Sequence, residues 1–402
     1  MAKPIGSGIL LQPTGMRVMK ELGLLESALE YGQRIDRLYG HTDRHFGKPW
    51  KFSQQVHKCV LDLQYKYLGE GYYGLGIHRG TLFELLFNQV SNIPNINVKC
   101  GMEVCKIEEN QDSARLYFKT PEGKHELLDQ YYDMVIISTG THSKLGNFEN
   151  RLAKPYEFGS LWGNAIDNTG YSNDRTLYQK YRNANKMSGL LPIGKCISSP
   201  KDNLVSIFWS LTQKDYMEFQ KLSRDGIDFM EWKQSLVDFW PSLEPFISQI
   251  TSKDQLTYAT YNDVQMSPDN WVTDRVVTIG DYCHGTSPQL GQGCSLAFVD
   301  AHVLNQCLEK TPLYSKQAQS NYSLKQALAE YRDKRMSHVI GYRLASRILT
   351  PFFQSNFHSV SYMRDIVMGP LCNIQPARWF MLRTLAGIQS GWFDTFDGKF
   401  FD

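Results

Sequence analysis

The sequence predicts an α/β fold with an inserted mixed sheet and a helical C-terminal region. Residues 276–308 have the pattern of a buried strand, an acidic turn, a glycine-containing loop and a helix. Short apolar segments typical of strands recur between residues 155 and 270, and residues 324–350 carry apolar side chains at helical spacing. At 402 residues the chain is long enough for two or three domains with sizeable cores.

Composition disfavours several classes of protein. Forty-three basic and 41 acidic residues leave a net charge of +2, which does not indicate an electrostatic nucleic-acid binder. No apolar run of about 18 residues occurs, so we expect no transmembrane segment. Eight cysteines without a Cys-x-x-Cys motif, and no signal peptide, predict reduced thiols in the cytoplasm.

One pair of histidines has a spacing compatible with a shared metal ion. His41 and His45 lie four residues apart. No cysteine or third histidine lies nearby to complete a ligand set, so we favour a solvated turn. We therefore predict no metal site.

The N-terminal quarter reads as helices and strands in alternation. Thr14 is the predicted N-cap of a first helix, and Gly23 its predicted end. Apolar residues follow Thr14 at helical intervals at Val18, Leu22, Leu25 and Leu29. Residues 37–68 alternate, which predicts a hairpin strand with one face formed by Leu61, Leu63, Tyr65 and Tyr67. Residues 76–87 read as a turn into an amphipathic helix with Leu82, Leu85 and Leu86 facing inward.

The middle of the chain reads mainly as strands. Residues 97–105 and 114–120 are strand-like, with a turn at residues 121–123, and residues 133–143 form a buried strand that enters a loop. Strand-like pieces at 159–162, 189–194 and 205–211, a helix at 232–241 and a strand at 255–264 follow. Four aromatic residues in this layer are candidates to line a pocket, although a plain core role is commoner: Trp162, Phe208, Trp209 and Tyr258.

The segment around residue 280 carries the strongest chemical signal. A β-branched run at 276–279 ends at Gly280-Asp281, which places a carboxylate at the C-terminal edge of a strand, where α/β sheets bind ligands. Pro288 stiffens the next loop, and Gly291 and Gly293 remove side chains from it. The helix that follows presents its N-terminus to an anionic or electron-rich ligand. The alternative is an ordinary βα turn in which the glycines only make tight bends.

The longer motif resembles the second FAD-binding motif of the p-hydroxybenzoate-hydroxylase-type (class A) FAD-dependent monooxygenases. The matching residues are Gly280-Asp-Tyr-Cys-His284, Ser287-Pro-Gln-Leu-Gly-Gln-Gly293 and Asp300-Ala301. The resemblance implies an FAD-binding, three-layer Rossmann-like domain. Within it Asp281 would bind the ribityl chain, and Pro288 would border the flavin. The backbone of four residues would face the pyrimidine end of the flavin: Gly291, Gln292, Gly293 and Cys294. Arg79, in an Arg-x-x-Leu pattern, matches an arginine that contacts FAD.

The resemblance also implies a division into domains. Residues 1–154 and 265–310 would form the FAD-binding domain, N-terminally incomplete. Residues 155–264 would form a substrate-binding sheet domain over the flavin, and residues 311–402 a C-terminal helical region.

Two departures from the family pattern qualify the resemblance. The Gly-x-Gly-x-x-Gly unit of the family, a βαβ unit of roughly 30 residues, has no room before Pro4. Either Met1 is an internal methionine of a longer gene, or the protein is a truncated relic. In addition, Thr139 replaces the aspartate of the family's Ala-Asp-Gly-x-x-Ser motif, while Gly140 and Ser143 agree. This replacement puts the handling of NAD(P)H in question.

The function implied by the resemblance is that of an FAD-dependent monooxygenase. It would hydroxylate an aromatic or related apolar substrate with NAD(P)H and O₂ through a C4a-hydroperoxyflavin. That chemistry requires no protein nucleophile or metal, and no catalytic residue is assigned; His284 would either shuttle protons or cap the acidic turn. Two alternatives stay open: a flavoprotein oxidoreductase or dehydrogenase of the same fold, or an inactive truncated remnant.

The C-terminal tail is rich in apolar and aromatic residues. They include Trp379, Phe380, Leu382, Leu385, Trp392 and Phe393. Such a tail can pack on the core, on a partner subunit in a homodimer, or on a membrane surface. We expect packing on the core, the simplest of the three.

Overall fold

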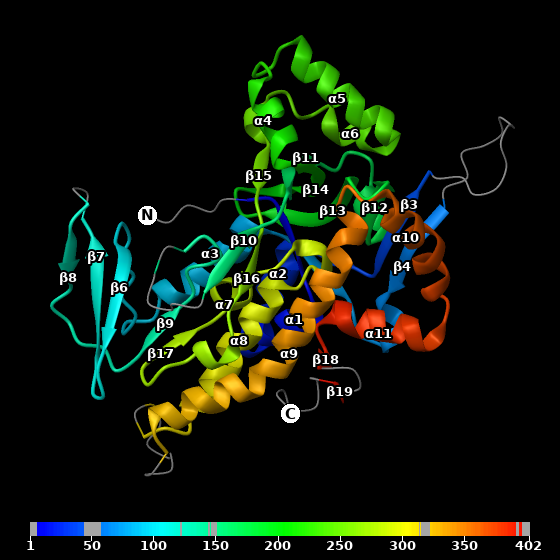
Figure 1. Ribbon diagram of the computed structural model, residues 1–402. Coiled ribbons are helices and arrows are strands. Elements are labelled where there is room, and N and C mark those ends of the chain that lie inside the picture. Colours follow the sequence, from blue (N-terminus) through cyan, green and yellow to red (C-terminus); the bar gives the residue numbers. More distant parts are fainter. Residues whose placement is uncertain are drawn as a thin grey trace, which may run out of the picture.

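The computed structural model describes residues 6–43, 58–120, 123–143, 145, 151–312, 314, 322–390 and 394–395. Its centre is a large mixed sheet with helices on both sides, and a small hairpin sheet extends from one end (Figure 1). Pro4, His45, Trp392 and Phe393, on which some of the predictions fall, lie outside the described residues.

The central sheet has seven strands in the order β15-β11-β14-β13-β12-β3-β4. Their bounds are β3 (Arg37–Thr42), β4 (Lys58–Gln64), β11 (Phe158–Ile166), β12 (Thr176–Arg182), β13 (Lys186–Cys196), β14 (Ser199–Thr212) and β15 (Thr257–Ala259). All neighbours pair antiparallel except β12 and β3, which are parallel. The mixed sheet predicted from residues after 155 thus also takes in a hairpin from the N-terminal segment.

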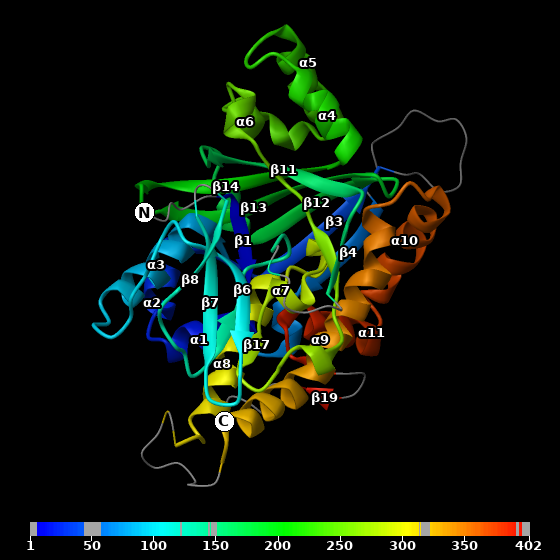
Figure 2. The same cartoon turned by 60° about the vertical axis from the view of Figure 1, so that its left-hand side comes forward.

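Strand alternation sends side chains of this sheet to two different cores. Leu190 and Ile207 point to a core that also contains Phe229 and Phe246. This core is closed by α4 (Gln213–Lys221), α5 (Ile227–Phe239) and α6 (Glu244–Ile247). In Figure 2 these helices lie on one side of the sheet and the rest of the molecule lies on the other. Leu191 and Phe208 belong to the core on that second side.

A second, three-stranded sheet has the order β1-β5-β2. Its strands are β1 (Gly8–Leu11), β2 (Gln33–Ile35) and β5 (Gly74–His78), accompanied by α1 (Pro13–Glu21), α2 (Leu25–Tyr31) and α3 (Arg79–Ser91). The N-cap position of α1 is Gln12, without a side-chain capping bond, rather than the predicted Thr14, because Pro13 supplies the fixed φ that suits a first helical position. The predicted end of this helix is confirmed, since Gly23 adopts a φ of +69° just beyond it.

The key motif forms a parallel strand pair followed by two helices. Strand β17 (Val276–Thr278) pairs with β9 (Val135–Ile137), and the chain continues into α7 (Asp281–His284) and α8 (Gly293–Leu308). Strand β10 (Leu152–Pro155) pairs with β16 (Asn262–Gln265) beside them. The strand, turn, loop and helix predicted for residues 276–308 are confirmed.

Two strand predictions were wrong in extent. The strand predicted at residues 97–105 begins at Glu103 and belongs to the hairpin sheet of β6 (Glu103–Glu109), β7 (Ala114–Lys119) and β8 (His125–Leu127). Tyr65 and Tyr67 do not continue the predicted hairpin strand. They lie in a single 3-10 turn after β4, where Tyr65 is needed for a buried hydrogen bond.

Three helices complete the fold. They are α9 (Leu324–Phe353), α10 (His358–Leu371) and α11 (Gln375–Ala386), followed by the short strands β18 (Gln389–Ser390) and β19 (Asp394–Thr395). Helix α9 begins with a capping box between Ser323 and Gln326, and it runs through Pro351 in its last turn rather than stopping there. No described helix combines the length and apolar character that a membrane span requires.

Candidate active site

The carboxylate of Asp281 stands beside the first turn of α8. Strand β17 is fully buried, and Gly280 leaves it with φ +63° and ψ −149°, a conformation that a side chain would strain. This turn leaves Asp281 exposed at the start of α7. A Cβ built on Gly293 would lie 3.6 Å from Asp281 Oδ1, so the carboxylate faces the N-terminal backbone of α8.

The loop before α8 exposes its backbone and buries one anchoring side chain. Residues Pro288–Leu290 form a single 3-10 turn, and Gly291 follows with φ +60°. Pro288 and Gly293 are exposed, whereas Gln292 is buried and donates from Nε2 to the carbonyl of Leu385 at the end of α11. The loop is therefore held from behind while its outer surface, carrying little side-chain bulk, stays accessible.

A buried glutamine at the end of β1, Gln12, contacts the first turn of α8 and lies behind this loop. The backbone N–H of Gln12 donates to Ser295 Oγ at 3.1 Å, in the first turn of α8. Its Oε1 accepts from the Tyr65 hydroxyl at 2.5 Å. Its Nε2 lies 3.7 Å from the position of a Cβ on Gly291, and it has no hydrogen-bond partner among the described residues. The loop thus has a fully buried, unpaired amide donor directly behind Gly291.

Arg79 approaches the same surface from a third segment. It is the first residue of α3, its N–H donates to the Ser7 carbonyl at 3.0 Å, and its side chain lies along Gly6. Burial raises the pKa of the Cys294 thiol to about 12; the neighbouring Asp281 carboxylate raises it further, and the Arg79 guanidinium opposes the rise. The charges of Arg79 and Asp281 therefore both act on Cys294 in the first turn of α8.

A buried ionic network around Asp300 holds the Gly280-Asp281 turn in place. Asp300, on α8, is fully buried and accepts from the Gly280 N–H at 2.8 Å, from His284 Nε2 at 2.6 Å and from Arg335 Nε at 2.7 Å. Burial alone would raise the pKa of Asp300, but the charges and hydrogen bonds of His284 and Arg335 lower it far below its ordinary range. The ionised carboxylate holds the glycine that precedes Asp281.

The network continues into the C-terminal region. Arg335 Nη1 contacts His338 Nδ1 at 2.5 Å, and His338 Nε2 contacts the Gly387 carbonyl at 2.9 Å. Burial and the Arg335 charge hold the pKa of His338 well below its ordinary value, so the ring is neutral and donates from Nε2. His284 is enclosed in this network, which favours the capping role over proton shuttling. Cys283, His284 and Asp300 cluster tightly enough for a metal ion, but the carboxylate already serves three donors.

A second loop is fixed beside α7 by an arginine that the motifs did not point to. Arg151 donates from Nε to the Tyr282 carbonyl at 2.7 Å and from Nη2 to the Thr141 carbonyl at 2.8 Å. Within this loop, Thr139 Oγ1 donates to Ser143 Oγ at 2.7 Å. The threonine that replaces the family's aspartate therefore stabilises its own loop.

The central sheet separates the four aromatic pocket candidates. Trp162 and Phe208 lie on the side shared with β1 and α9, with ring centroids 5.0 Å apart. Trp209 and Tyr258 point to the opposite side, into the core under α4–α6. The commoner core role is therefore confirmed for these four residues, and they do not share one pocket, because neighbouring positions on a strand face opposite ways. On the first side Trp162 Nε1 donates to the Tyr261 hydroxyl at 3.3 Å.

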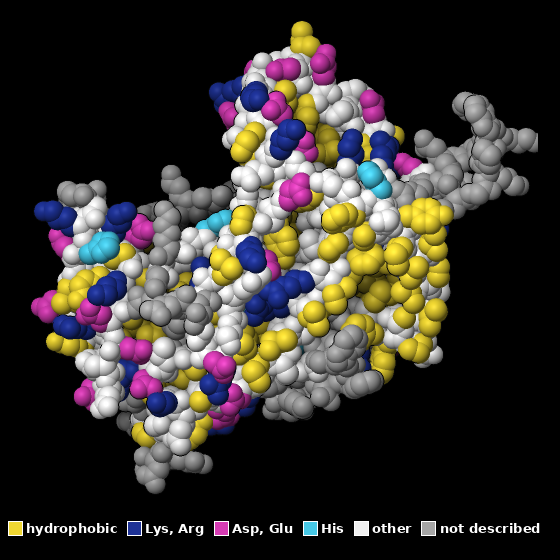
Figure 3. Space-filling view, viewed as in Figure 1, with side chains coloured by type: hydrophobic (Ala, Val, Ile, Leu, Met, Phe, Trp, Pro, Cys, Tyr) yellow, Lys and Arg dark blue, Asp and Glu magenta, His cyan; other side chains and the backbone are white. Residues whose placement is uncertain are grey.

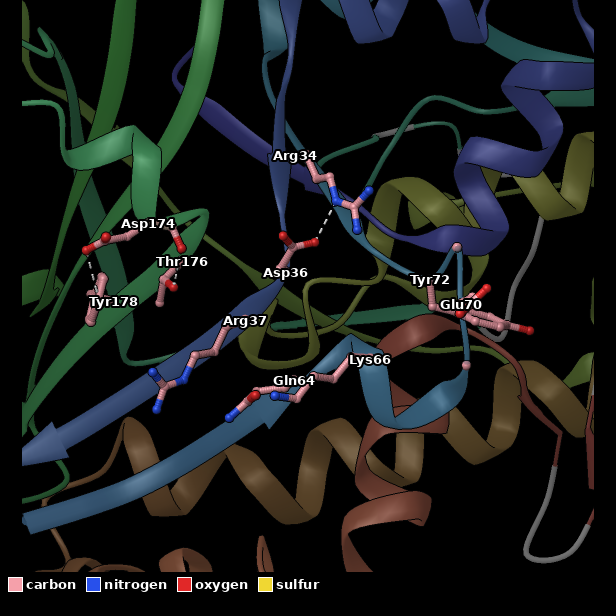
Figure 4. A pocket seen from close by; sticks show the side chains of 12 residues that line it. Arg34, Asp36, Arg37, Gln64, Lys66, Glu70, Tyr72, Asp174, Thr176 and Tyr178 are labelled. Atoms are coloured by element: carbon pink, nitrogen blue, oxygen red, sulfur yellow. Dashed lines mark hydrogen bonds and ion pairs between the residues drawn. The ribbon is translucent and has the colours of Figure 1, made fainter.

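A separate polar cleft of about 590 Å³ lies at β2, β3 and β4 (Figure 4). None of the seven predicted site residues lines it. Its walls carry their own ion pairs, including Arg34 with Asp36 at 2.6 Å and Arg37 with Asp62 at 2.7 Å. The cleft is lined by balanced charges and by no residue of the glycine loop.

Four of the seven predicted residues come together, while Gln292 is buried behind them, and several supporting residues were not predicted. Arg79, Asp281, Gly293 and Cys294 come together from three segments. Gln12, Arg151 and Arg335 were missed, because each acts through contacts more than 30 positions away in sequence. Among the supporting residues that hold the turn, Asp300 was marked by a sequence motif, the Asp300-Ala301 pair.

Comparison with known proteins gives this geometry a context. No family model matches the chain. It is 22% identical over 352 residues to 6-hydroxynicotinate 3-monooxygenase of Bordetella bronchiseptica, covering 83% of this chain and 81% of that protein. It is 26% identical over 336 residues to 3-amino-4-hydroxybenzoate 2-monooxygenase of Streptomyces cremeus, covering 79% and 73%.

A solved structure agrees over nearly the whole fold. HpxO of Klebsiella pneumoniae, complexed with FAD and uric acid, has a TM-score of 0.70 at 18% identity, covering 96% of this chain and 89% of that one. The predicted fold class, with its mixed sheet and C-terminal helices, is confirmed. The homologues of this chain are FAD-dependent monooxygenases of the p-hydroxybenzoate-hydroxylase type, and the chain has their fold.

Proposed function

We propose that this protein is an FAD-dependent monooxygenase that hydroxylates an aromatic or related apolar substrate, with NAD(P)H and O₂ as co-substrates. The observation that carries the proposal is the exposed Asp281 carboxylate beside the exposed N-terminus of α8, with Arg79 close by. The names of the relatives support it, since both act on hydroxylated aromatic or heteroaromatic acids.

The residues around the glycine loop fit the parts of FAD. Asp281 would accept hydrogen bonds from ribityl hydroxyls, and Arg79 would pair with the pyrophosphate, the anionic part of the cofactor. The backbone from Gly291 to Cys294 would face the pyrimidine ring, with Pro288 at the border of the flavin. The missing side chain at Gly293 leaves space for that approach. The free amide donor of Gln12 stands behind the same loop.

When bound, FAD supplies the redox chemistry, accepting electrons from the nicotinamide and activating O₂. The protein contributes binding, orientation and electrostatics. The N-terminus of α8 places a partial positive charge where negative charge would develop on the pyrimidine ring. The apolar side of the central sheet, with Trp162 and Phe208, would exclude water from the reacting groups.

One observation favours a second redox role on the same fold. The loop after β9 presents Thr139, hydrogen-bonded to Ser143, where the family motif has a carboxylate. If that loop does not support a nicotinamide, the protein would be a flavoprotein oxidoreductase or dehydrogenase with another electron partner. For either role we propose the cytoplasm as the compartment, because all eight cysteines are free thiols.

The decisive experiment measures flavin binding first and turnover second. The purified chain is reconstituted with FAD, and bound flavin is quantified by its visible absorbance. NADH and NADPH oxidation are then followed with and without hydroxylated aromatic acids, and ¹⁸O₂ incorporation into product is measured by mass spectrometry. Substrate-stimulated oxidation with label in the product supports the monooxygenase, whereas bound flavin without label supports the second role.

A matched pair of variants links the result to the site. We expect Asp281→Asn to weaken FAD binding about tenfold, the loss of one charged hydrogen-bond partner. Asp225→Asn, at an exposed position remote from the loop, should bind FAD like the unaltered protein. A chain that binds no FAD under any of these conditions would contradict the proposal.

A further inference from the structure

Helix α9 has an exposed apolar row on its outer side. Met336, Ile340, Leu344 and Ile348 are spaced by four residues and therefore lie on one side of the helix. Their exposed fractions are between 38% and 53%. An outward row of this kind is unusual for a helix whose inner side is already packed in the core.

Helices α10 and α11 extend this row into a broad surface. Exposed apolar residues on and between them are Phe357, Tyr362, Met363, Ile366, Val367, Ile374, Trp379 and Phe380. Together with the α9 row they form what we call the apolar face. Figure 3 shows hydrophobic side chains gathered over α10 and α11 and along α9.

The apolar face is not the result of poorly docked helices. The inner sides of α9 and α11 contribute Phe353, Leu382 and Leu385 to the main core, where they are 7%, 0% and 6% exposed. The expected packing of the tail on the core is therefore confirmed for Leu382 and Leu385, but Trp379 is 54% exposed and Phe380 38%. These helices are apolar on both sides, and large exposed apolar surfaces mark interaction sites.

The charged residues of the segment that carries the apolar face are mostly arginines. Residues 336–390 contain five arginines and a single acidic residue, Asp365. Asp365 and Arg364 are both fully buried and paired at 2.6 Å, so neither presents its charge to the surface. Arg347 pairs with Asp263 of β16 at 3.0 Å. Arg378 stacks on Tyr67 at 3.9 Å, and Arg383 stacks on Trp379 at 5.0 Å at the border of the face.

We propose that the apolar face docks on the surface of a membrane that contains anionic lipids. Apolar and aromatic side chains would enter the boundary between headgroups and acyl chains, and the bordering arginines would pair with lipid phosphates. The helices would lie along the surface, consistent with the absence of a membrane-spanning helix among the described residues. This inference goes beyond the proposed function and does not depend on it.

The same charges disfavour a second copy of the chain as the occupant. In a twofold-symmetric dimer the same surface of each subunit meets itself. Arg378 and Arg383 at the border of each face would then meet no exposed carboxylate from residues 336–390 of the other copy. Lipid phosphates supply the missing negative charge.

The test is vesicle flotation of the purified full chain. Vesicles of phosphatidylcholine alone are compared with vesicles that also contain phosphatidylglycerol. We expect the chain to float with the anionic vesicles, to bind the neutral vesicles more weakly, and to lose part of its binding as salt is added. The double variant Met363→Gln/Ile366→Gln should lower the partition coefficient at least about tenfold.

A matched control exists on α5. Ile227 and Met230 are also an isoleucine and a methionine three residues apart, exposed by 80% and 53%, on the far side of the sheet. Ile227→Gln/Met230→Gln should float like the unaltered chain. If the α10 variant unfolds, the pair Leu344→Gln/Ile348→Gln on α9 serves as the second variant of the face.

Three results would overturn the proposal. The first is no flotation with either kind of vesicle. The second is equal loss of binding in the α10, α9 and α5 variants. The third is a dimer in sedimentation equilibrium that the α10 variant dissociates while no variant floats, which would assign the face to a second copy.

Discussion

Arg335 on α9 donates from Nε to Asp300 Oδ1 on α8 at 2.7 Å, and both side chains are fully buried. The same carboxylate accepts the N–H of Gly280, the residue that sets the direction of the Asp281 turn. The pair therefore couples the helical C-terminal region to the candidate cofactor site. Its role is to position the turn, since neither group is exposed to a ligand.

Removing the cation should be costly for this reason. We expect Arg335→Met to lower the free energy of unfolding by about 3–5 kcal/mol, because it leaves the Asp300 carboxylate buried with too little compensation. Thermal unfolding followed by circular dichroism measures the effect. Lys325→Met, which breaks a surface pair with Asp274, is the control and should leave the melting temperature nearly unchanged. Similar melting temperatures for the two variants would contradict this assignment.

The buried histidine His338 should make stability depend on pH. Its pKa in the folded protein is held well below its ordinary value of 6.5 by burial and by Arg335. Above pH 6.5 the ring is neutral in both folded and unfolded states. As the pH falls below 6.5 the unfolded chain gains a proton that the folded protein cannot accept, so stability decreases.

Urea unfolding between pH 5 and pH 7.5 tests this expectation, on the pH range that the ordinary histidine pKa defines. The unaltered protein should lose stability across the acidic half of that range, and His338→Gln should flatten the slope. His125→Gln, on the exposed strand β8, should keep the slope. An unchanged slope in His338→Gln would show that another group titrates there.

A substitution at Gly293 should change FAD affinity without changing the stability of the fold. A Cβ at this position meets only Asp281 Oδ1 at 3.6 Å, an ordinary contact, so Gly293→Ala should fold with unchanged stability. The added methyl would occupy the space in front of the α8 backbone, and we expect FAD binding to weaken about tenfold. Titration of FAD fluorescence together with thermal unfolding measures both. Full FAD affinity in this variant would place the pyrimidine ring elsewhere.

Arg79 should distinguish FAD from flavins without phosphate. If its guanidinium pairs with the pyrophosphate, Arg79→Gln should weaken FAD binding about tenfold and leave riboflavin binding unchanged. Fluorescence titrations with FAD and with riboflavin, at low and moderate salt, measure the two affinities. Arg115→Gln on the hairpin strand β7 is the control. Equal weakening for FAD and riboflavin would mean that Arg79 supports the loop and not the phosphate.

Sequence patterns predicted the parts of this protein whose structure depends on a few neighbouring residues. The β-branched run, Gly280-Asp281 and the glycine loop before α8 predicted strand, turn and helix correctly, because periodicity and turn chemistry act over a few neighbouring residues. The motif was also long enough to indicate the family before any fold was known. It named a set of residues, four of which the fold brings together from separate segments.

Which side chains share a surface depends instead on how the helices and strands pack. Whether Trp209 joins Trp162 depends on the strand face, and a strand that packs on two cores gives apolar signals on both. Arg335 contacts Asp300, and His338 contacts Gly387. Both contacts depend on how α9 packs against α8 and the end of α11, which no local pattern encodes. The apolar face likewise depends on tertiary packing, because one side of each helix is buried in the core and the other side stays exposed.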